Sequence, residues 1–172
     1  MPDITLRIAK PDDRVVVLAL MKSAALWLRE RDIDYWQNWL EPPAHHLTWV
    51  DEGLAAGQFR IVDFEGAPAG CLRLQPDDEM FWGRRDDSAG YVHFLTVDRA
   101  LAGRELGRLI LDTVAGDLEA SGASFLRLDC GVGVVGLRRY YESCGFVAVG
   151  EATVDGEDHV LYERALRRSF DR

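Results

Sequence analysis

The segment from Val97 to Leu111 holds the residue types that most directly suggest a binding chemistry. A strand is expected to end at Val97, and a short loop that contains glycine then leads into a helix. The first N–H groups of a helix have no partner within it, and the helix dipole adds positive charge, so phosphate binds well there. Glycine lets a ligand approach the backbone closely. The segment favours a phosphate-binding loop, and an ordinary strand-to-helix turn is the alternative.

A second segment, with two adjacent tyrosines, lies one strand and one helix further along the chain. Its apolar residues recur at helical spacing and share one helix face, which ends at Gly145; they are Leu137, Tyr140, Tyr141 and Cys144. Tyr141 therefore has two possible roles. Its hydroxyl can take part in chemistry, or the side chain is simply part of the core.

The elements that position these segments follow from hydrophobic periodicity. We expect strands over 4–8, 59–64, 69–74, 91–97, 124–129, 146–152 and 159–163, and helices to about residue 30, over 46–56, over 103–121 and around 137–144. The unit of strand 91–97, helix 103–121 and strand 124–129 is a crossover, so its strands should be parallel. The polar stretch 75–89 is expected to be a solvated loop, and attraction of an amine to its acidic residues is the alternative.

The chain has 172 residues with a formal net charge of −9, which indicates one soluble domain over residues 1–172 and argues against nucleic acid as a partner. No apolar run reaches the roughly 18 residues of a membrane span, and the N-terminal residues do not read as a secretory signal. Three cysteines without CxxC spacing indicate neither disulfides nor zinc, and no metal is expected. A reducing, cytoplasmic location is the simplest expectation.

The order of elements and two motifs resemble the GNAT superfamily of acetyl-CoA-dependent N-acetyltransferases. The first motif is V-x-x-x-x-R-G-x-G-x-G, which corresponds to the segment beginning at Val97. The second is N-x-x-L-x-x-Y-Y-x-x-x-G-F, which ends at Gly145-Phe146. The resemblance covers most of the chain. It implies an α/β (α+β) fold with a mixed, mostly antiparallel seven-stranded sheet, a splayed parallel central pair and about four helices.

The resemblance also implies roles for individual residues. Tyr141 would be the general acid that protonates the departing thiolate, and His93, on the strand before the phosphate loop, would be the general base. Tyr91 or a chain of water molecules would be the rival base, and a structural role is the alternative for His93. The residues expected to hold coenzyme A are Leu95, Val97, Arg99, Gly103, Arg104, Leu106, Gly107 and Arg108.

Three residues depart from the motifs of this family. Ala102 replaces the usual Arg or Gln, Glu105 replaces the first glycine, and Val134 replaces the usual Asn. Glu105 matters most, because it brings a side chain and a negative charge to a backbone that should approach phosphate. We therefore expect Glu105 to limit the affinity for the coenzyme, with nearby arginines offsetting its charge.

The chemistry of acetyl transfer fits these residue types. An amine with a pKa near ~10 is mostly protonated at neutral pH, and a neutral imidazole can accept its proton. A tyrosine can protonate a thiolate, while Cys130 fits a buried thiol better than a nucleophile of a two-step transfer. Tyr35, Trp36 and Tyr91 are candidates to line the acceptor site, and the aromatic residues of the first two helices fit a core equally well.

The function predicted from the sequence is direct transfer of an acetyl group from acetyl-CoA to the primary amine of a small molecule in a ternary complex. A non-catalytic acyl-CoA sensor of the same fold is one alternative, and a protein N-terminal or lysine acetyltransferase is another. The expected partner is a small-molecule amine acceptor, and a homodimer is possible. Neither nucleic acid nor a membrane is an expected partner.

Overall fold

The computed structural model describes residues 3–167, which form seven strands, five α-helices and three short 3-10 helices. The elements, in chain order, are β1 (Ile4–Ile8), η1 (Pro11–Asp13), α1 (Arg14–Arg29), η2 (Gln37–Trp39), α2 (Ala44–Ala55), β2 (Phe59–Phe64), β3 (Ala67–Gln75), α3 (Glu79–Trp82), β4 (Ala89–Val97), η3 (Arg99–Leu101), α4 (Leu106–Ala120), β5 (Phe125–Gly131), α5 (Val135–Ser143), β6 (Val147–Val154) and β7 (Glu157–Ala165). The strands form one sheet in the order β1-β2-β3-β4-β5-β7-β6. The predicted mixed seven-stranded sheet is confirmed. The described residues contain five α-helices, one more than the four expected.

The chain divides into two compact units. The first comprises the chain up to Leu74 together with Phe94–Ile110, and the second comprises Gln75–His93 and the chain from Leu111 onward. β4 belongs to both units, since the boundary falls between His93 and Phe94. The single domain over residues 1–172 stays a prediction.

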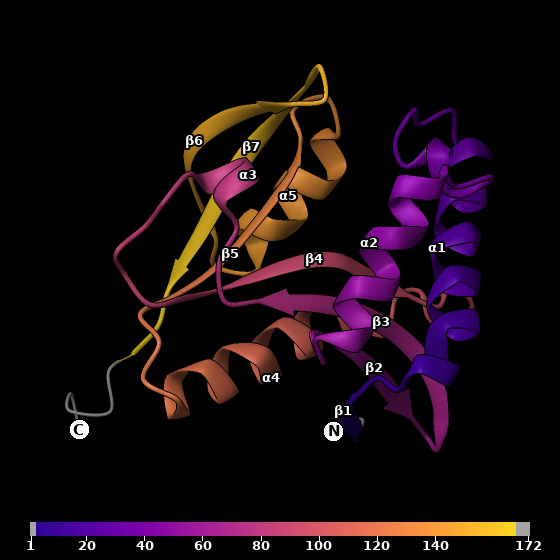
Figure 1. The fold of residues 1–172 in the computed structure, drawn as a ribbon, viewed down its shortest axis with the longest axis horizontal. Coiled ribbons are helices and arrows are strands. Elements are labelled where there is room, and N and C mark those ends of the chain that lie inside the picture. The colour runs from indigo at the N-terminus through magenta and orange to yellow at the C-terminus, as the bar shows by residue number, and fades with distance from the viewer. Residues whose placement is uncertain (1–2, 168–172) are drawn as a thin grey trace. The chain divides into compact units, whose positions relative to one another are not determined.

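In the first unit, β1, β2 and β3 form an antiparallel sheet whose apolar face is covered by α1 and α2 (Figure 1). The core between them contains Val17 and Met21 from α1, Val50 from α2 and Ile61 from β2. These residues recur at helical spacing on the helices and at alternate positions on the strand, so the periodicity of the sequence is enough to define this core.

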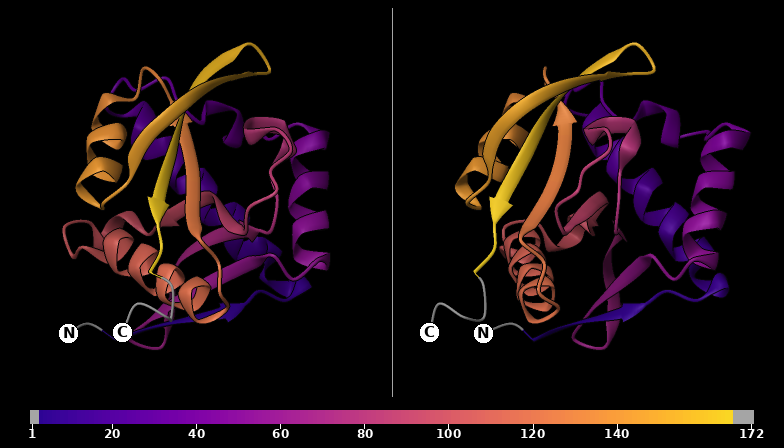
Figure 2. Two further views of the ribbon diagram at one scale, coloured as in Figure 1. Left: turned by 90° about the vertical axis from the view of Figure 1, so that its left-hand side faces the viewer. Right: turned by 60° about the vertical axis from the view of Figure 1, so that its left-hand side comes forward.

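In the second unit, β5 pairs in parallel with β4 on one side and antiparallel with β7 on the other. β6 and β7 form an antiparallel hairpin, and Figure 2 shows this yellow hairpin beside β5, with α5 next to it. The parallel register runs from Ala89↔Phe125 to Tyr91↔Arg127, while β4 continues to Val97 and β5 to Gly131. The predicted crossover and its parallel strands are confirmed.

The polar stretch over residues 75–89 differs from the solvated loop expected there. It contains α3, and Trp82 is 7% exposed while Asp78 is 9% exposed. Asp78 begins the helix as its N-cap and accepts a hydrogen bond from the N–H of Phe81 at 3.4 Å. A helix of four residues is too short to produce a periodic signal, which explains why the sequence did not indicate it.

Across the described part of the chain, no helix combines the length and the apolar character needed to cross a membrane.

A buried arginine on β5 ties three segments of the second unit together. The side chain of Arg127 is 1% exposed and donates two hydrogen bonds of 2.6 Å to the carboxylate of Asp87. It donates further bonds to Glu163 on β7, at 2.8 Å, and to the hydroxyl of Tyr91 on β4, also at 2.8 Å. A buried charge is tolerated only when it is paired and hydrogen-bonded in this way.

Arg127→Met should therefore destabilise the protein strongly. The change leaves Asp87 and Glu163 without their cation, and removal of one partner of a buried ion pair costs about 3–5 kcal/mol. Denaturant unfolding followed by circular dichroism measures the loss. Arg14→Met is the matched control, because the ion pair of Arg14 with Asp51 is exposed to solvent and should contribute little to stability. Equal losses in the two variants would contradict a structural role for the Arg127 network.

Candidate active site

The register of β4 and β5 places two ionisable side chains at the same level. Tyr91 is paired with Arg127, so His93 and Asp129, two residues further along parallel strands, come next on the same face. Their side chains do meet: Nδ1 of His93 lies 3.7 Å from Oδ1 of Asp129. Both side chains are largely buried, with exposed fractions of 14% and 8%.

The other ring nitrogen of His93 contacts the cap of α3. Nε2 of His93 lies 2.9 Å from Oδ2 of Asp78, whose side chain is 7% exposed. An ionised carboxylate only accepts hydrogen bonds, so the ring proton of neutral His93 lies on Nε2 and the lone pair on Nδ1. The contact thus selects one tautomer and directs the basic nitrogen towards Asp129.

A second histidine, His159, contacts the other carboxylate oxygen of Asp129. Nδ1 of His159, on β7, lies 2.9 Å from Oδ2 of Asp129. The close contact with Asp129 raises the pKa of His159 above its ordinary value of 6.5, burial opposes the shift, and Asp129, Glu157 and Asp158 favour the charged form electrostatically. The side chains therefore form a chain in the order Asp78, His93, Asp129, His159.

The short helix α3 packs over this chain of polar groups. The ring of Phe81 lies 5.6 Å from the ring of His93 and 5.0 Å from that of His159, measured between centroids. Trp82 lies next to it against Tyr91, at 5.8 Å. Burial under aromatic rings excludes water and strengthens the electrostatic interactions among the polar groups.

Asp78, Asp129 and His159 were not predicted as site residues. One signal for Asp129 was present, because Arg127 and Asp129 alternate with apolar residues in a strand that is otherwise buried. Charged residues on one face of a buried strand need partners on the neighbouring strands. Asp78 gave no such signal, since its position depends on the unpredicted helix α3.

Asp78, His93 and Asp129 offer donor atoms that all lie within 4.8 Å of one another. Carboxylate oxygen and imidazole nitrogen are the usual ligands of divalent metals. The two carboxylates, however, face different nitrogens of the same ring. The 2.9 Å contact between Asp78 and Nε2 of His93 is that of a direct hydrogen bond, and the 3.7 Å contact between Asp129 and Nδ1 is that of an ion pair.

The predicted phosphate loop lies in the first unit and begins with the 3-10 helix η3. Oδ1 of Asp98 accepts a hydrogen bond from the N–H of Ala100 at 3.0 Å and so caps this turn. The first i→i−4 bond of α4 runs from the N–H of Leu109 to the carbonyl of Glu105. The N–H groups of 106–108, which include Leu106 and Gly107, come before this bond, as in a helix N-terminus that binds anions. The helix begins at Leu106 rather than at 103.

The three arginines of the loop have distinct contacts. The guanidinium of Arg99 lies 4.3 Å from the ring centre of Trp27 on α1, and that of Arg104 lies 5.5 Å from the ring centre of Phe64. Arg108 forms an ion pair of 3.2 Å with Glu105. Arg104 and Arg108 remain 53% and 40% exposed, so both can reorient towards an anion.

Glu105 occupies a backbone conformation that suits glycine. Its φ of +57° lies in the left-handed region, where residues with a Cβ are strained. The carboxylate is 71% exposed and turns towards Arg108. The backbone at Glu105 thus has the conformation expected for the glycine of the motif, and Arg108 partly offsets the negative charge of the Glu105 side chain. Gly103 also has a positive φ, of +82°.

The end of β4 carries a second unusual backbone position. Phe94 has a φ of +55°, so the strand is irregular between His93 and Leu95. The hydroxyl of Thr96 donates to the carbonyl of Phe94 at 3.1 Å. Such an irregularity turns backbone groups away from regular pairing, at the stretch whose Leu95 and Val97 were predicted to meet the coenzyme.

Tyr141 is buried on α5, with 6% of its surface exposed. Its ring packs against Phe146 and Tyr162, at centroid distances of 6.0 and 6.2 Å.

Cys130 is fully buried, and burial raises the pKa of its thiol to about 12. A thiol with this pKa is a poor nucleophile at neutral pH, in agreement with the buried thiol expected from the sequence.

The aromatic candidates for the acceptor site have different surroundings. In the first unit, Tyr35 stacks on Trp36 at 5.6 Å, and Trp36 lies 5.6 Å from Phe94. Both Tyr35 and Trp36 are half-buried, whereas Trp39 belongs to the core. In the second unit, the hydroxyl of Tyr91 is held by Arg127 in the interior. The hydroxyl of Tyr91 therefore belongs to the Arg127 network, and its predicted contact with an acceptor stays a prediction.

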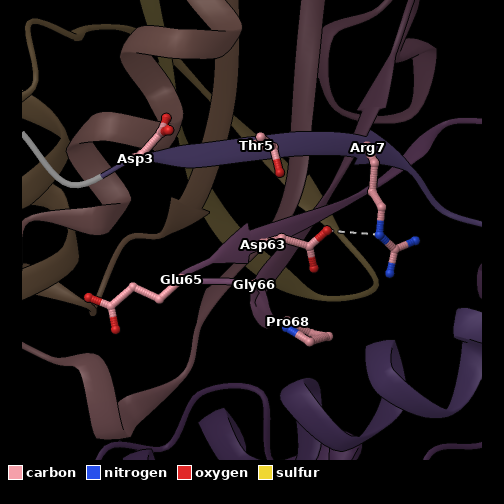
Figure 3. Close-up of a pocket in the computed structure, with 7 residues that line it drawn as sticks. All are labelled: Asp3, Thr5, Arg7, Asp63, Glu65, Gly66 and Pro68. Atoms are coloured by element: carbon pink, nitrogen blue, oxygen red, sulfur yellow. Dashed lines mark hydrogen bonds and ion pairs between the residues drawn. The ribbon is translucent and has the colours of Figure 1, made fainter.

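A shallow pocket at the β1–β2 edge of the first unit is lined by charged and small residues. Figure 3 shows Arg7 beside Asp63, to which its Nε donates a hydrogen bond of 2.9 Å. Its lining is Asp3, Thr5, Arg7, Asp63, Glu65, Gly66 and Pro68, which are not among the predicted site residues. Arg7 is also paired with Asp13, at 2.7 Å, so its charge is already neutralised.

Comparison with known proteins identifies the family of this chain. The family model described as "Acetyltransferase (GNAT) family" matches residues 18–146. An uncharacterized N-acetyltransferase of Bacillus subtilis strain 168, YesJ, is 26% identical over 163 residues, which cover 90% of this chain and 86% of YesJ. The chain therefore belongs to the GNAT acetyltransferase family. It is an acyltransferase, and its family uses acetyl-CoA as the acetyl donor.

Solved structures show the same fold. A GNAT acetyltransferase of Listeria monocytogenes 4b F2365 superposes with a TM-score of 0.76 at 26% identity, over 95% of both chains. The PaiA N-acetyltransferase of Thermoplasma acidophilum, solved in complex with coenzyme A, superposes with a TM-score of 0.68 at 15% identity. That superposition covers 95% of this chain and 99% of PaiA.

Glu105→Gly should tighten binding of coenzyme A. Removal of one carboxylate near phosphate is worth about 1 kcal/mol at a water-exposed site, or roughly a fivefold lower Kd. It also releases Arg108 and relieves the left-handed strain. Isothermal titration calorimetry measures the effect. Asp155→Gly is the matched control, because Asp155 is exposed and has a φ of +52° but lies in the β6–β7 turn. Equal or weaker binding to the Glu105 variant would show that this carboxylate points away from the coenzyme.

His159→Asn should lower stability in a pH-dependent way. The asparagine amide can still donate to Asp129 but carries no charge. Because the pKa of His159 is raised in the folded state, its charge stabilises the protein fully below 6.5, and this contribution disappears as the pH rises through the folded value. Thermal unfolding should show a larger difference between parent and variant at about pH 6 than at about pH 9. A difference that does not change with pH would contradict the ion pair.

Proposed function

We propose that this acetyltransferase transfers an acetyl group from acetyl-CoA directly to the primary amine of a small molecule, with His93 as general base. The observation that carries the proposal is the 2.9 Å contact between Nε2 of His93 and Asp78. This contact leaves Nδ1 as the basic nitrogen on the strand that leads into the phosphate loop. A base within a largely buried site is suited to remove a proton from an ammonium group.

In this proposal the coenzyme binds to β4 and to the loop that follows it. The backbone of Leu95 and Val97 meets the pantetheine arm, and the N–H groups at the start of α4 meet the pyrophosphate. Arg99, Arg104 and Arg108 supply positive charge around the loop, and the two exposed ones turn towards the phosphates. The open left-handed position at Gly103 allows the backbone to approach them.

The acceptor arrives mostly as an ammonium ion, because its pKa is near ~10. Nδ1 of His93 accepts one proton, and the neutral amine then attacks the thioester carbonyl. Tyr141 protonates the departing thiolate, in the role implied by its place in the second motif. Direct transfer is supported by the buried state of Cys130, whose pKa of about 12 argues against an acyl-enzyme on this residue.

The proposed acceptor is a small molecule whose apolar part is bounded by Tyr35 and Trp36. Both rings are half-buried, and aromatic faces attract cationic groups. The negative charge of the chain, −9, also favours a cationic acceptor. Acetylation of a protein N-terminus or lysine, and acyl-CoA sensing without catalysis, are the competing functions.

One assay separates these functions. Release of thiol from acetyl-CoA is measured with a panel of small amines, free amino acids and peptides. The proposal predicts turnover with small primary amines, and little with peptides. Turnover confined to peptides would establish a protein acetyltransferase, and coenzyme binding without turnover of any acceptor would favour the sensor. Addition of a chelator should leave the rate unchanged, as expected if no metal takes part.

His93→Ala should remove the base and reduce the rate by roughly 10²–10⁴-fold. In the parent enzyme the rate at limiting amine should rise with pH as His93 loses its proton, and the variant should lose this limb. A pH–rate profile measured with the best acceptor tests both expectations. A profile that keeps its limb in the variant would assign the base to another group, with ordered water next in line.

Tyr141→Phe keeps the ring and its packing against Phe146 and Tyr162, so the protein should fold normally. Turnover should fall on the order of 10²-fold, with little change in coenzyme affinity, because the lost proton transfer matters in the transition state. Tyr140→Phe is the control and should be nearly silent, since a rotation of about 100° separates neighbouring helical side chains. A Tyr141 variant with the parent rate would contradict its role as the acid.

A further inference from the structure

Two residues of the polar chain have no role in the acetyl transfer described so far. Asp129 and His159 are 8% and 10% exposed in their side chains and lie 2.9 Å apart. Burial of two charged groups is costly unless each is well paired, and an apolar pair of similar size would pack at least as well. Their place beside the general base suggests that they serve the reaction rather than stability alone.

Two negatively charged carboxylates lie close to the ring of His93. His93 has a carboxylate at each ring nitrogen, with Asp78 at 2.9 Å from Nε2 and Asp129 at 3.7 Å from Nδ1. An imidazole between two uncompensated carboxylates is held in its protonated form, and an imidazolium cannot accept a proton. A functional base in this position requires that one of the two negative charges be balanced.

His159 supplies the balancing charge. Its ring binds the oxygen of Asp129 that faces away from His93, since Oδ2 contacts His159 and Oδ1 faces His93. The groups that face His159 in the second unit are Asp129 on β5, the ring of Phe81 on α3, and the neighbouring Glu157 and Asp158 on β7. On β6 its register partner is Ala152, which carries no charge.

We propose that Asp129 and His159 are positioning residues that act as a charge-compensated pair: the charge of His159 balances that of Asp129, so that His93 is neutral when the acceptor arrives and still has Asp129 as an ion-pair partner once it is protonated. The inference rests on the proposed function, because it assigns His93 as the base. It adds a reason for the two buried residues, which that function alone does not require.

The proton steps balance as follows. One N–H bond of the acceptor ammonium breaks, a bond forms between that proton and Nδ1 of His93, and the electron pair stays on the amine nitrogen. The imidazolium so formed has Nδ1–H directed towards Oδ1 of Asp129, 3.7 Å away, within the range of an ion pair. Asp129 shares its charge between the two rings, while Asp78 keeps the Nε2 proton in place.

The proposal makes opposite predictions for the two residues. His159→Asn removes the compensating charge but keeps an amide donor near Asp129, so protonated His93 is favoured. The midpoint of the acid limb of the pH–rate profile should then move up by about one unit. Asp129→Asn removes the carboxylate, so the midpoint should move down. For His159→Asn, the rate well above the new midpoint should therefore be closer to the parent rate than the rate below it.

The double variant tests whether His159 acts through Asp129. If it does, His159→Asn should shift the midpoint in the parent but not in the Asp129→Asn background, since no carboxylate charge is left to compensate. His45→Asn is a control for loss of a histidine, because His45 is exposed on α2. It should leave the midpoint unchanged.

The protonation of His93 is also measured without any acceptor, by NMR titration of its ring in the full-length protein and its variants. Shifts of the His93 midpoint that are opposite in sign for the two single variants would support the proposal. Unchanged midpoints with a rate reduced equally at every pH would overturn it, because both residues would then be merely structural. A requirement for a divalent metal in place of these shifts would overturn it as well.

Separate results would contradict the proposed acetyl transfer and the proposed compensation of Asp129 by His159. If no amine is acetylated, the proposed function is wrong, and the NMR titration still decides whether His159 compensates Asp129. If amines are acetylated but the His93 midpoint does not respond to either variant, the function stands and the compensation proposal is wrong.

Discussion

The parallel register of β4 and β5 is the constraint on which the candidate site depends. It pairs Tyr91 with Arg127 and thereby brings His93 to the level of Asp129. A slip of one residue would turn one of these side chains to the opposite face of the sheet and separate them. The network of Arg127 with Asp87, Glu163 and Tyr91 fixes this register, so a structural arginine contributes indirectly to the geometry of the base.

The four-residue helix α3 contributes to the candidate site because its N-cap residue, Asp78, contacts His93. α3 places Asp78 against His93 at one end and Trp82 against Tyr91 at the other. Asp78 thus has two tasks: Oδ1 caps the helix, and Oδ2 selects the tautomer of His93. Helix formation and orientation of the base are coupled through one carboxylate.

Much of the fold could be predicted, because strands and long helices produce strong periodic signals and the crossover determines which strands are parallel. The sequence motif also predicted that Glu105 stands where the family has a glycine, and the left-handed backbone at Glu105 agrees with that prediction. The partners of His93 were not predicted. Asp78, Asp129 and His159 come from three separate segments, and their proximity depends on strand register and on a helix too short for a periodic signal. The contact of the Tyr91 hydroxyl with Arg127 was not predicted for the same reason, since the two residues are distant in sequence.

The most direct test of the account is a crystal structure of the protein with coenzyme A and its best amine acceptor. The account predicts that the amine nitrogen lies within about 3 Å of Nδ1 of His93, on the side that faces Asp129, with Nε2 still bound to Asp78. An amine nitrogen bound away from His93, or a His93 ring turned so that Nδ1 contacts Asp78, would contradict it.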